Sequence, residues 1–342
     1  MRIALDATYS VDRYPSGIAV YSREMLAGLA AEHPDDSFLF CYRVKQFSRA
    51  PAPVAANVRR RVLIPPLTTF GADLFHALNQ RVDKRPARKV VSTFHDLFVM
   101  TEEYSSPEFR ARFSEQARRA AGNSDMIITV SEFTATQVNN ILGVSRERIR
   151  VVPHGVRMPS YPITATREKL ILFVGALQTR KNVIRLVEAF EAIPGDWRLI
   201  LAGASNGFGA EQILQKIDSS RCRHRIQVTG YLSDAELQRL YSAASIFAFP
   251  SLAEGFGIPV LEAMAHGIPV ITSGDSALAE VAGDAAYLVD PRRTDQIEDA
   301  LNRLMENCEL RDKFRELGFQ RALLFSWERA VRGTYAVYRD LA

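Results

Sequence analysis

The chain has 342 residues, 47% of them apolar, and a formal net charge of +4. This length suits two domains of ordinary size, and no stretch approaches the roughly 20 apolar residues that span a membrane. Residues 1–6 are typical of a strand rather than a signal peptide. Three scattered cysteines without metal-ligand spacing favour a reducing, cytoplasmic setting without disulfides or zinc.

The positive charge is concentrated in the first half of the chain. Residues 1–157 hold 22 Lys and Arg against 16 Asp and Glu, a net charge of +6, whereas residues 158–342 hold 21 against 23, a net charge of −2. A basic half favours contact with an anionic acceptor or with the inner surface of the membrane, although an ordinary solvated face has the same composition. No aromatic residues alternate with the basic clusters, which argues against nucleic acid as a partner.

Strands and helices are expected to alternate along the first half. Apolar runs predict strands, and a periodicity of about 3.6 residues predicts helices. In chain order we expect a strand at 3–6, a helix at 18–31, and strands at 38–42, 74–77 and 89–94. A helix around 107–121, a strand at 126–130 and a helix capped by Ser131 follow. The stretch 157–166 is the expected linker.

The second half repeats this alternation. Strands are expected at 170–174, 198–202, 226–229, 246–249, 269–272 and 287–289, with helices at 182–193 and about 211–219. Ser233 and Glu236 form a capping box that opens a further helix, and two amphipathic helices are expected to finish the chain. Such alternation predicts an α/β protein with two doubly wound, parallel-sheet domains. Ligands bind such sheets at the carboxyl ends of the strands, so the expected site is the cleft between the domains.

The segment 250–265 carries the strongest functional signal. Glu254 follows a predicted strand and Glu262 lies eight positions later, with Gly255, Gly257 and Pro259 between them. Pro259 fits the first position of a helix, which places Glu262 in the first turn. The glycines let the backbone approach a ligand, and the helix start favours an anion. The segment could therefore hold a sugar joined to a ribose through a diphosphate, or be a structural loop with two solvated glutamates.

Several segments resemble those of retaining glycosyltransferases of family 4, in the same order along the chain. Val174 to Asn182 is similar to the donor-phosphate segment of the family, Gly230 to Asp234 to its base-binding turn, and Pro250 to Ala265 to its signature of two glutamates. The segments 270–273 and 280–285 also match. The resemblance implies the GT-B fold: two Rossmann-like domains facing a cleft, with a C-terminal helix that crosses back to the first. It assigns residues 1–157 to acceptor binding, 158–326 to donor binding and 327–342 to that helix.

The resemblance also implies roles for individual residues. Thr93 to Leu97 is similar to the segment with the active-site histidine, and Tyr14 to Ile18 to the glycine loop that approaches the diphosphate. The implied catalytic residues are His95, Glu254 and Asp96; the donor-phosphate residues are Gly17, Arg180, Lys181, Gly255, Phe256, Gly257 and Ile258; and the nucleoside-binding residues are Gly203, Tyr231, Leu232 and Glu262.

Two features suggest how the negative charge on the leaving diphosphate is stabilised. Many relatives carry an arginine directly after the glycine at 175, but this chain has Ala176, so Arg180 and Lys181 must supply the positive charge. Which of them contacts which phosphate is left open. The chain also lacks an Asp-x-Asp motif, which metal-dependent glycosyltransferases of the other major fold use. We therefore expect a reaction without metal or cofactor, driven by fixed cations and a helix N-terminus.

The leading hypothesis is a retaining, metal-independent glycosyltransferase. Residues 180–182 and 250–259 resemble the corresponding segments of bacterial mannosyltransferases, and this resemblance implies GDP-mannose as donor, with UDP- or dTDP-sugars as alternatives. The acceptor is expected to be a saccharide or lipid-linked saccharide of a surface polysaccharide. Rivals are a nucleotide-sugar epimerase of the same fold and a catalytically silent nucleotide-sugar-binding subunit, although Glu254 and His95 argue against the latter. An NAD-dependent oxidoreductase lacks support, because no Gly-x-Gly-x-x-Gly follows the first strand.

Overall fold

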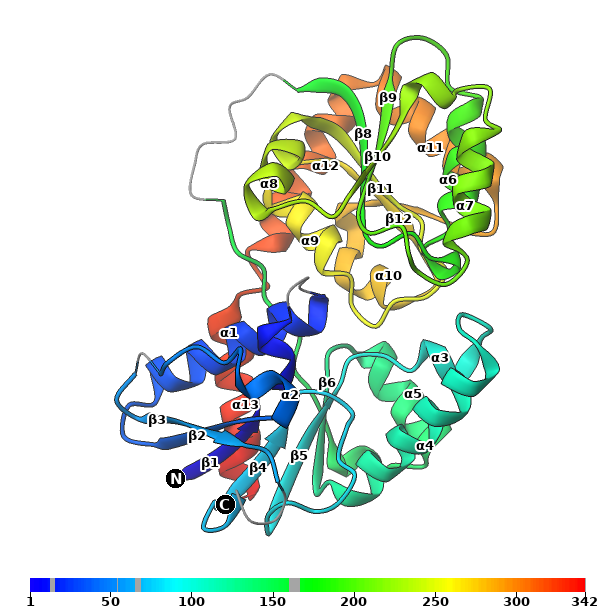
Figure 1. Ribbon diagram of the computed structural model, residues 1–342. Coiled ribbons are helices and arrows are strands. Elements are labelled where there is room, and N and C mark those ends of the chain that lie inside the picture. The colour runs from blue at the N-terminus through cyan, green and yellow to red at the C-terminus, as the bar shows by residue number, and fades with distance from the viewer. Residues whose placement is uncertain (13–15, 54, 65–68, 160–166, 342) are drawn as a thin grey trace. The chain divides into compact units, whose positions relative to one another are not determined.

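The computed structural model describes residues 1–12, 16–53, 55–64, 69–159 and 167–341 (Figure 1). The chain divides into two compact units. Unit 1 comprises Met1–Gly155 and Ser326–Ala342, and unit 2 comprises Val156–Phe325. Most of the linker expected at 157–166 lies outside the described residues.

Unit 1 is built on a sheet of seven parallel strands in the order β3-β2-β1-β4-β5-β6-β7. The strands are β1 (Arg2–Asp6), β2 (Ser37–Tyr42), β3 (Val58–Val62), β4 (Leu74–Ala77), β5 (Lys89–Phe94), β6 (Met126–Thr129) and β7 (Ile149–Val151). The helices are α1 (Gly17–Glu32), α2 (Val44–Phe47), α3 (Phe98–Thr101), α4 (Pro107–Asn123), α5 (Glu132–Leu142) and α13 (Trp327–Leu341). Ser131 caps α5 as predicted, because its Oγ accepts from Thr134 N at 3.0 Å.

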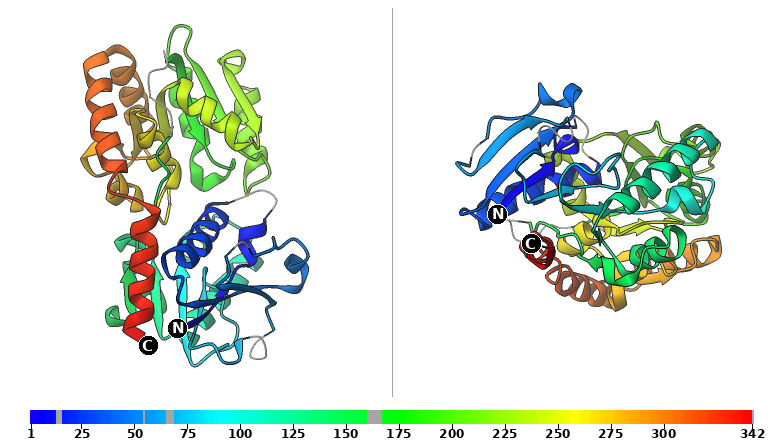
Figure 2. Two further views of the ribbon diagram at one scale, coloured as in Figure 1. Left: turned by 90° about the vertical axis from the view of Figure 1, so that its left-hand side faces the viewer. Right: turned by 90° about the horizontal axis from the view of Figure 1, so that it is seen from below.

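Both faces of this sheet are buried. Ile3 and Leu5 of β1 belong to one apolar cluster, and Ala4 between them belongs to another on the opposite face. The first cluster contains α1 and α13, which lie side by side in Figure 2. Trp327, Val331 and Tyr338 are buried there. The C-terminal helix therefore packs on the first domain, as the resemblance implied.

Unit 2 repeats the architecture with six parallel strands in the order β10-β9-β8-β11-β12-β13. These are β8 (Glu168–Val174), β9 (Arg198–Ala202), β10 (Ile226–Gly230), β11 (Ala244–Phe249), β12 (Val270–Ser273) and β13 (Tyr287–Val289). Its helices are α6 (Val183–Glu191), α7 (Ala210–Asp218), α8 (Asp234–Ala243), α9 (Ile258–Ala265), α10 (Ala277–Ala282), α11 (Thr294–Glu306) and α12 (Cys308–Ala322). Two doubly wound parallel sheets confirm the predicted α/β class, and the Ser233–Glu236 capping box is present.

Local details differ from the sequence prediction. No strand was predicted between residues 42 and 74, but Arg59 to Arg61 lie in edge strand β3, where exposed charges protect an unpaired edge. The chain ends in three helices rather than two, because Asn307 caps α12 by accepting from Leu310 N at 2.9 Å. Helix α9 begins at Ile258, so Pro259 is its second residue and Glu262 lies beyond its first turn.

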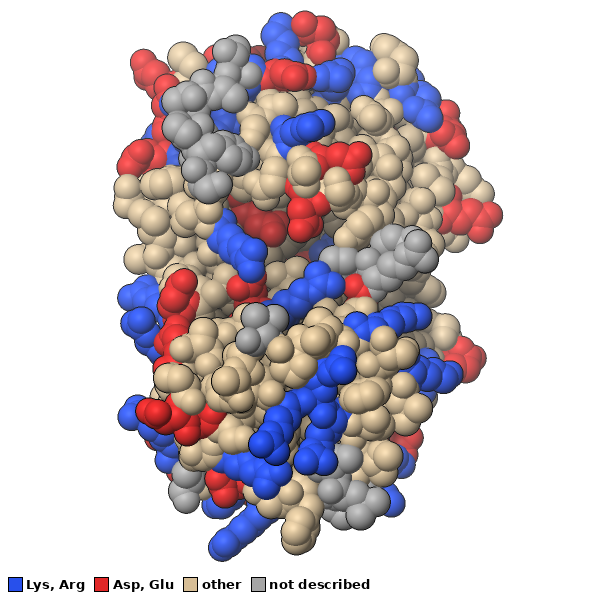
Figure 3. All heavy atoms as spheres, turned by 60° about the vertical axis from the view of Figure 1, so that its left-hand side comes forward, with Lys and Arg blue, Asp and Glu red and all other residues tan. Residues whose placement is uncertain are grey.

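Among the residues described, none of the helices combines the length and apolarity needed to cross a membrane. Figure 3 shows Lys and Arg side chains gathered on the face of unit 1 that is turned to the viewer.

A buried polar network ties the C-terminal helix to the sheet of unit 1. The OH of Tyr338 and Nδ1 of His76 share a hydrogen bond of 2.6 Å, and Nε2 of His76 pairs with Oγ1 of Thr93 at 2.8 Å. The OH of Tyr21 pairs with the same Thr93 oxygen at 2.9 Å. Burial lowers the pKa of His76 to about 3, so this histidine is neutral at physiological pH. The network thus joins α13, β4, β5 and α1 through neutral hydrogen bonds.

We predict that Tyr338→Phe destabilises the protein by about 1–3 kcal/mol, because it leaves a buried nitrogen of His76 without its partner while changing little volume. Urea denaturation followed by circular dichroism measures this difference. An unchanged free energy of unfolding would show that the hydrogen bond contributes nothing to the attachment of α13.

Candidate active site

One carboxylate oxygen in unit 2 lies close to three polar side chains. Oε1 of Glu254 lies 2.7 Å from Nη1 of Arg180 and 2.6 Å from Nζ of Lys181. The Oγ of Ser251 donates to the same oxygen at 2.8 Å. All three charged side chains are largely buried, with 10–12% of their surface exposed. The structure therefore brings together two predicted phosphate-binding cations and the carboxylate predicted to face the sugar.

Two loops at the carboxyl ends of neighbouring strands create this cluster. Arg180 and Lys181 follow β8, while Ser251 and Glu254 follow β11, the next strand in the sheet. Backbone hydrogen bonds join the loops, because Leu252 N donates to the carbonyl of Arg180 at 2.7 Å. This is the sheet edge at which α/β proteins bind ligands.

Asn182 fixes the loop after β8. It has a left-handed backbone with φ of 58°, and its side-chain amide donates to the carbonyls of Pro250 and Pro291 at 3.0 and 2.6 Å. Asparagine tolerates this conformation better than most residues. The buried amide thus holds the two basic residues against the loop that carries Glu254.

The cluster combines two cations with one carboxylate. Burial alone would raise the pKa of Glu254, but Arg180 and Lys181 together hold it below its usual value, so the carboxylate is ionised. Two cations then face one anion. Lys181 Nζ also lies 4.5 Å from the centroid of the Phe249 ring, a contact that favours the cation.

The start of α9 is shaped by a glycine. Gly257 has φ of 108°, and a Cβ there would lie 2.4 Å from Cδ2 of Leu278. Phe256 before it is buried, with its ring edge-on to Phe325 at 5.9 Å. The side chain of Phe256 therefore packs in the interior, and a ligand role for this residue is limited to its backbone. Gly255 is buried and Ile258 is the first residue of α9.

Glu262 has a different environment from Glu254. Its Oε2 accepts from the OH of Tyr241 on α8 at 2.8 Å, and burial raises its pKa. Because burial disfavours its charged form, this carboxyl group suits hydroxyl donors as partners. Sequence reasoning missed Tyr241, which lies 21 positions away on another helix.

The other predicted nucleoside-binding residues lie around the ends of β9 and β10. Gly203 N donates to the carbonyl of Gly230 at 3.0 Å, and a Cβ at Gly203 would lie 2.1 Å from the carbonyl oxygen of Gly175. The glycine is therefore required by close backbone packing. Tyr231 is 44% exposed and Leu232 is half-buried, so both reach the surface directly after β10.

In unit 1 the predicted catalytic histidine is paired with a second histidine. Nε2 of His95 donates to the carbonyl of Leu78 at 2.9 Å, which leaves Nδ1 as an acceptor for His154 Nε2 at 3.3 Å. Burial lowers the pKa of His95 to about 4 and that of His154 well below its usual value. Both rings are therefore neutral at physiological pH. The pairing joins residues 59 positions apart, and the sequence alone gave no sign of it.

Two further predicted residues lie in unit 1. Asp96 is half-buried directly after His95. Gly17 is the exposed first residue of α1, and Ser16 caps this helix by accepting from Ala19 N at 3.4 Å. The rest of the predicted glycine loop, Tyr14 and Pro15, lies outside the described residues.

Comparison with known proteins identifies the family. The family model for Glycosyltransferase Family 4 matches residues 15–158, and that for glycosyl transferases group 1 matches residues 162–321. The chain belongs to glycosyltransferase family 4. This is a family of retaining hexosyltransferases, and the match confirms the resemblance drawn from the motifs.

Characterised relatives include mannosyltransferases. The chain is 29% identical to the O-antigen chain mannosyltransferase B of Escherichia coli, over 78% of this chain and 74% of that protein. It is 31% identical to the MMP alpha-(1->4)-mannosyltransferase of Mycolicibacterium hassiacum, over 66% of this chain but 56% of that protein. The solved sucrose-phosphate synthase of Thermosynechococcus elongatus has a TM-score of 0.79 at 22% identity, covering 100% of this chain and 99% of that one. This likeness shows the GT-B fold.

The neutral histidines of unit 1 make its stability depend on pH. His95 and His154 bind fewer protons in the folded state than in the unfolded chain, where the pKa of histidine is about 6.5. The two neutral rings contribute fully to the free energy of unfolding above about pH 6.5. Below that pH this contribution is lost, by up to about 1.4 kcal/mol per pH unit for each histidine. We predict that stability declines from about pH 7 to 5.5, a range in which ordinary carboxylates stay ionised.

Urea denaturation across that range measures the decline, and His154→Gln is the matched variant. Because the substitution removes one titrating group, it should make stability less dependent on pH. An equally steep decline in the variant would contradict the assignment to His154.

Proposed function

We propose that the protein transfers mannose from GDP-mannose, with retention of anomeric configuration, to a saccharide or lipid-linked saccharide acceptor in surface polysaccharide synthesis. The two relatives named as mannosyltransferases support the sugar, and the O-antigen name of one of them supports the acceptor class. The reaction belongs in the cytoplasm, at the inner membrane surface where the acceptor is lipid-linked.

The observation that carries this proposal is the cluster of Glu254 with Arg180 and Lys181. When the bond between the sugar and the diphosphate breaks, negative charge grows on the leaving phosphate. Arg180 can bind phosphate oxygens with two N–H groups, and Lys181 adds a point charge. The backbone of residues 255–258 at the start of α9 adds N–H groups that favour an anion. These groups can stabilise the leaving group.

Glu254 acts in two ways in this proposal. In the free protein it neutralises part of the charge of Arg180 and Lys181. When the diphosphate engages these cations, the carboxylate is free to accept hydroxyls of the donor sugar and to stabilise positive charge on its anomeric carbon. The hydroxyl of the acceptor then attacks on the face from which the diphosphate leaves, and Glu254 forms no covalent bond.

His95 is proposed to act as a neutral group. Both of its ring nitrogens are engaged, with Leu78 and His154. Binding of a donor hydroxyl by the ring would require one of these partners to be displaced, so we favour the backbone carbonyl of His95 as the group that stabilises the cationic sugar. Asp96 is assigned as the base, or as the residue that orients the acceptor hydroxyl.

The nucleoside is proposed to bind unit 2. The carboxyl group of Glu262 already accepts a hydrogen bond from the hydroxyl of Tyr241. It accepts hydrogen bonds from the ribose hydroxyls in the same way. Gly203, Tyr231 and Leu232 face the base. We assign residues 1–157 to the acceptor, residues 158–326 to the donor, and residues 327–342 to the helix that completes the first domain.

Incubation with GDP-mannose, other nucleotide sugars and a saccharide acceptor tests this proposal. The expected result is an α-linked mannoside, identified by proton NMR, together with GDP. Formation of an epimerised sugar without any acceptor would identify an epimerase. Binding of GDP without turnover by any donor would identify a silent subunit, and either result would reject the proposal.

We predict that Glu254→Gln lowers kcat about 100-fold or more, because it removes the charge that stabilises the sugar cation. GDP should still bind at least as tightly as to the wild type, because Arg180 and Lys181 remain. Initial rates and calorimetric titration with GDP measure the two effects. The matched control is Glu211→Gln, an exposed carboxylate on α7. Equal loss of turnover and GDP affinity would reject this role for Glu254.

We also predict that EDTA leaves the transfer rate unchanged. Fixed cations take the place of a metal in the proposed mechanism, and the chain has no Asp-x-Asp motif. The comparison is of initial rates with and without the chelator. A loss of activity that added Mg²⁺ or Mn²⁺ restores would show that the leaving group needs a metal.

A further inference from the structure

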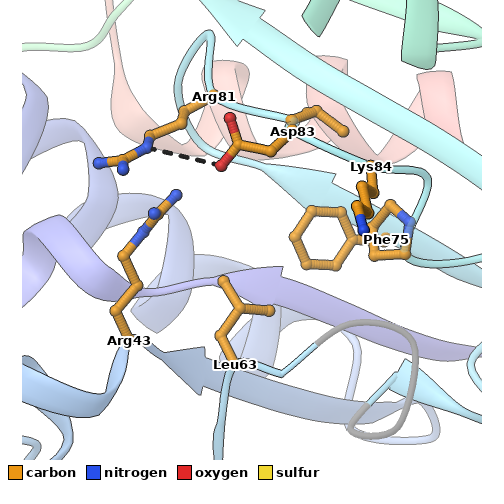
Figure 4. Close-up of a pocket in the computed structure, with 8 residues that line it drawn as sticks. Arg43, Leu63, Phe75, Arg81, Asp83 and Lys84 are labelled. Atoms are coloured by element: carbon orange, nitrogen blue, oxygen red, sulfur yellow. Dashed lines mark ion pairs between the residues drawn. The ribbon is translucent and has the colours of Figure 1, made fainter. Parts of the chain in front are cut away.

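Unit 1 contains a basic cavity of about 190 Å³ that is separate from the cluster around Glu254. Arg43, Arg81 and Lys84 line it, with Asp83 as the one carboxylate among the described lining residues (Figure 4). Its apolar walls include Leu63, Phe75 and Pro86. Arg43 directly follows β2 and Leu63 directly follows β3, whereas Phe75 lies within β4 and Pro86 lies shortly before β5.

The guanidinium groups of Arg43 and Arg81 have unused hydrogen-bond donors among the described residues. Their guanidinium groups point toward one another in Figure 4. Within the described part of the chain, the buried Nε of Arg43 and the buried Nε of Arg81 have no hydrogen-bond partner. An unsatisfied buried donor costs about 1–3 kcal/mol, and such groups call for a specific explanation.

The nearby carboxylates form ion pairs with the two arginines but no hydrogen bonds to them (Figure 4). Oδ2 of Asp6 lies 3.9 Å from Nη2 of Arg43, and Oδ2 of Asp83 lies 4.0 Å from Nε of Arg81. Both distances exceed a hydrogen bond. Asp6 already accepts from the backbone and the hydroxyl of Thr8 through its other oxygen. An oxyanion in the cavity could accept from both guanidinium groups and separate their like charges.

We propose that this cavity binds a phosphoryl group of the acceptor. The inference rests on the proposed function, because it names the chemical class of the acceptor as a phosphate or diphosphate ester. A tetrahedral phosphoryl group offers oxygens in several directions, which suits two guanidinium forks and an ammonium better than one planar carboxylate does. Leu63, Phe75 and Pro86 provide an apolar wall for the carbon chain beside the phosphate.

The test is calorimetric titration of the full chain with inorganic pyrophosphate in the presence of saturating GDP, which occupies the proposed donor site. Pyrophosphate should bind the wild type, and Arg43→Gln or Arg81→Gln should each weaken binding about tenfold or more. Arg59→Gln is the control, because it removes the same charge from an exposed position on β3. It should change affinity less than about twofold. Thermal melting checks that each variant is folded.

Two results would overturn the proposal: no binding of pyrophosphate once GDP is saturating, or equal weakening by all three substitutions. Failure of the proposed function would look different. GDP would then not bind, while Arg43→Gln and Arg81→Gln would still weaken the binding of pyrophosphate. Farnesyl diphosphate distinguishes the two sources of the phosphoryl group. If farnesyl diphosphate binds more tightly than pyrophosphate, the acceptor is lipid-linked. If the two bind equally, the acceptor is a soluble phosphorylated molecule. Both results support the site.

Discussion

The site in unit 2 depends on a single oxygen atom, Oε1 of Glu254, which holds Arg180, Lys181 and Ser251 together. The cluster is mostly buried, so its charges are weakly screened and strongly coupled. A buried ion pair contributes little net stability, because desolvation offsets most of the attraction. The cluster is therefore better explained by function, since it gathers two cations and a carboxylate at the sheet edge where α/β proteins bind ligands.

The surrounding structure keeps this cluster in place. Parallel strands β8 and β11 end at the same edge of the sheet, and the loops that follow them carry its members. The left-handed Asn182 and the glycine before α9 give these loops their shape. In the described part of unit 1, the buried Nε atoms of Arg43 and Arg81 have no hydrogen-bond partner, which makes their cavity a second candidate for an anionic ligand.

The sequence was sufficient for features with local causes. Apolar runs located most strands, and the caps at Ser131 and Ser233 needed only neighbouring residues. Strand β3 was missed because its three successive arginines are all exposed, so the strand lacks both an apolar run and an alternation of apolar and polar residues. The motifs identified the family, but Glu254 lies in one motif and Arg180 and Lys181 lie in another, far away along the chain. Their pairing, like those of His95 with His154 and Glu262 with Tyr241, arises only when distant strands meet, which spacing along the chain cannot show.

A double-mutant cycle on GDP affinity tests most directly whether Glu254 restrains the cations of the donor site. Calorimetry would compare the wild type, Glu254→Gln, Lys181→Met and the double variant. The account predicts that Glu254→Gln tightens GDP binding severalfold and that this gain shrinks when Lys181 is also replaced, so the two effects are not additive. Additive effects, or weaker GDP binding by Glu254→Gln alone, would contradict it.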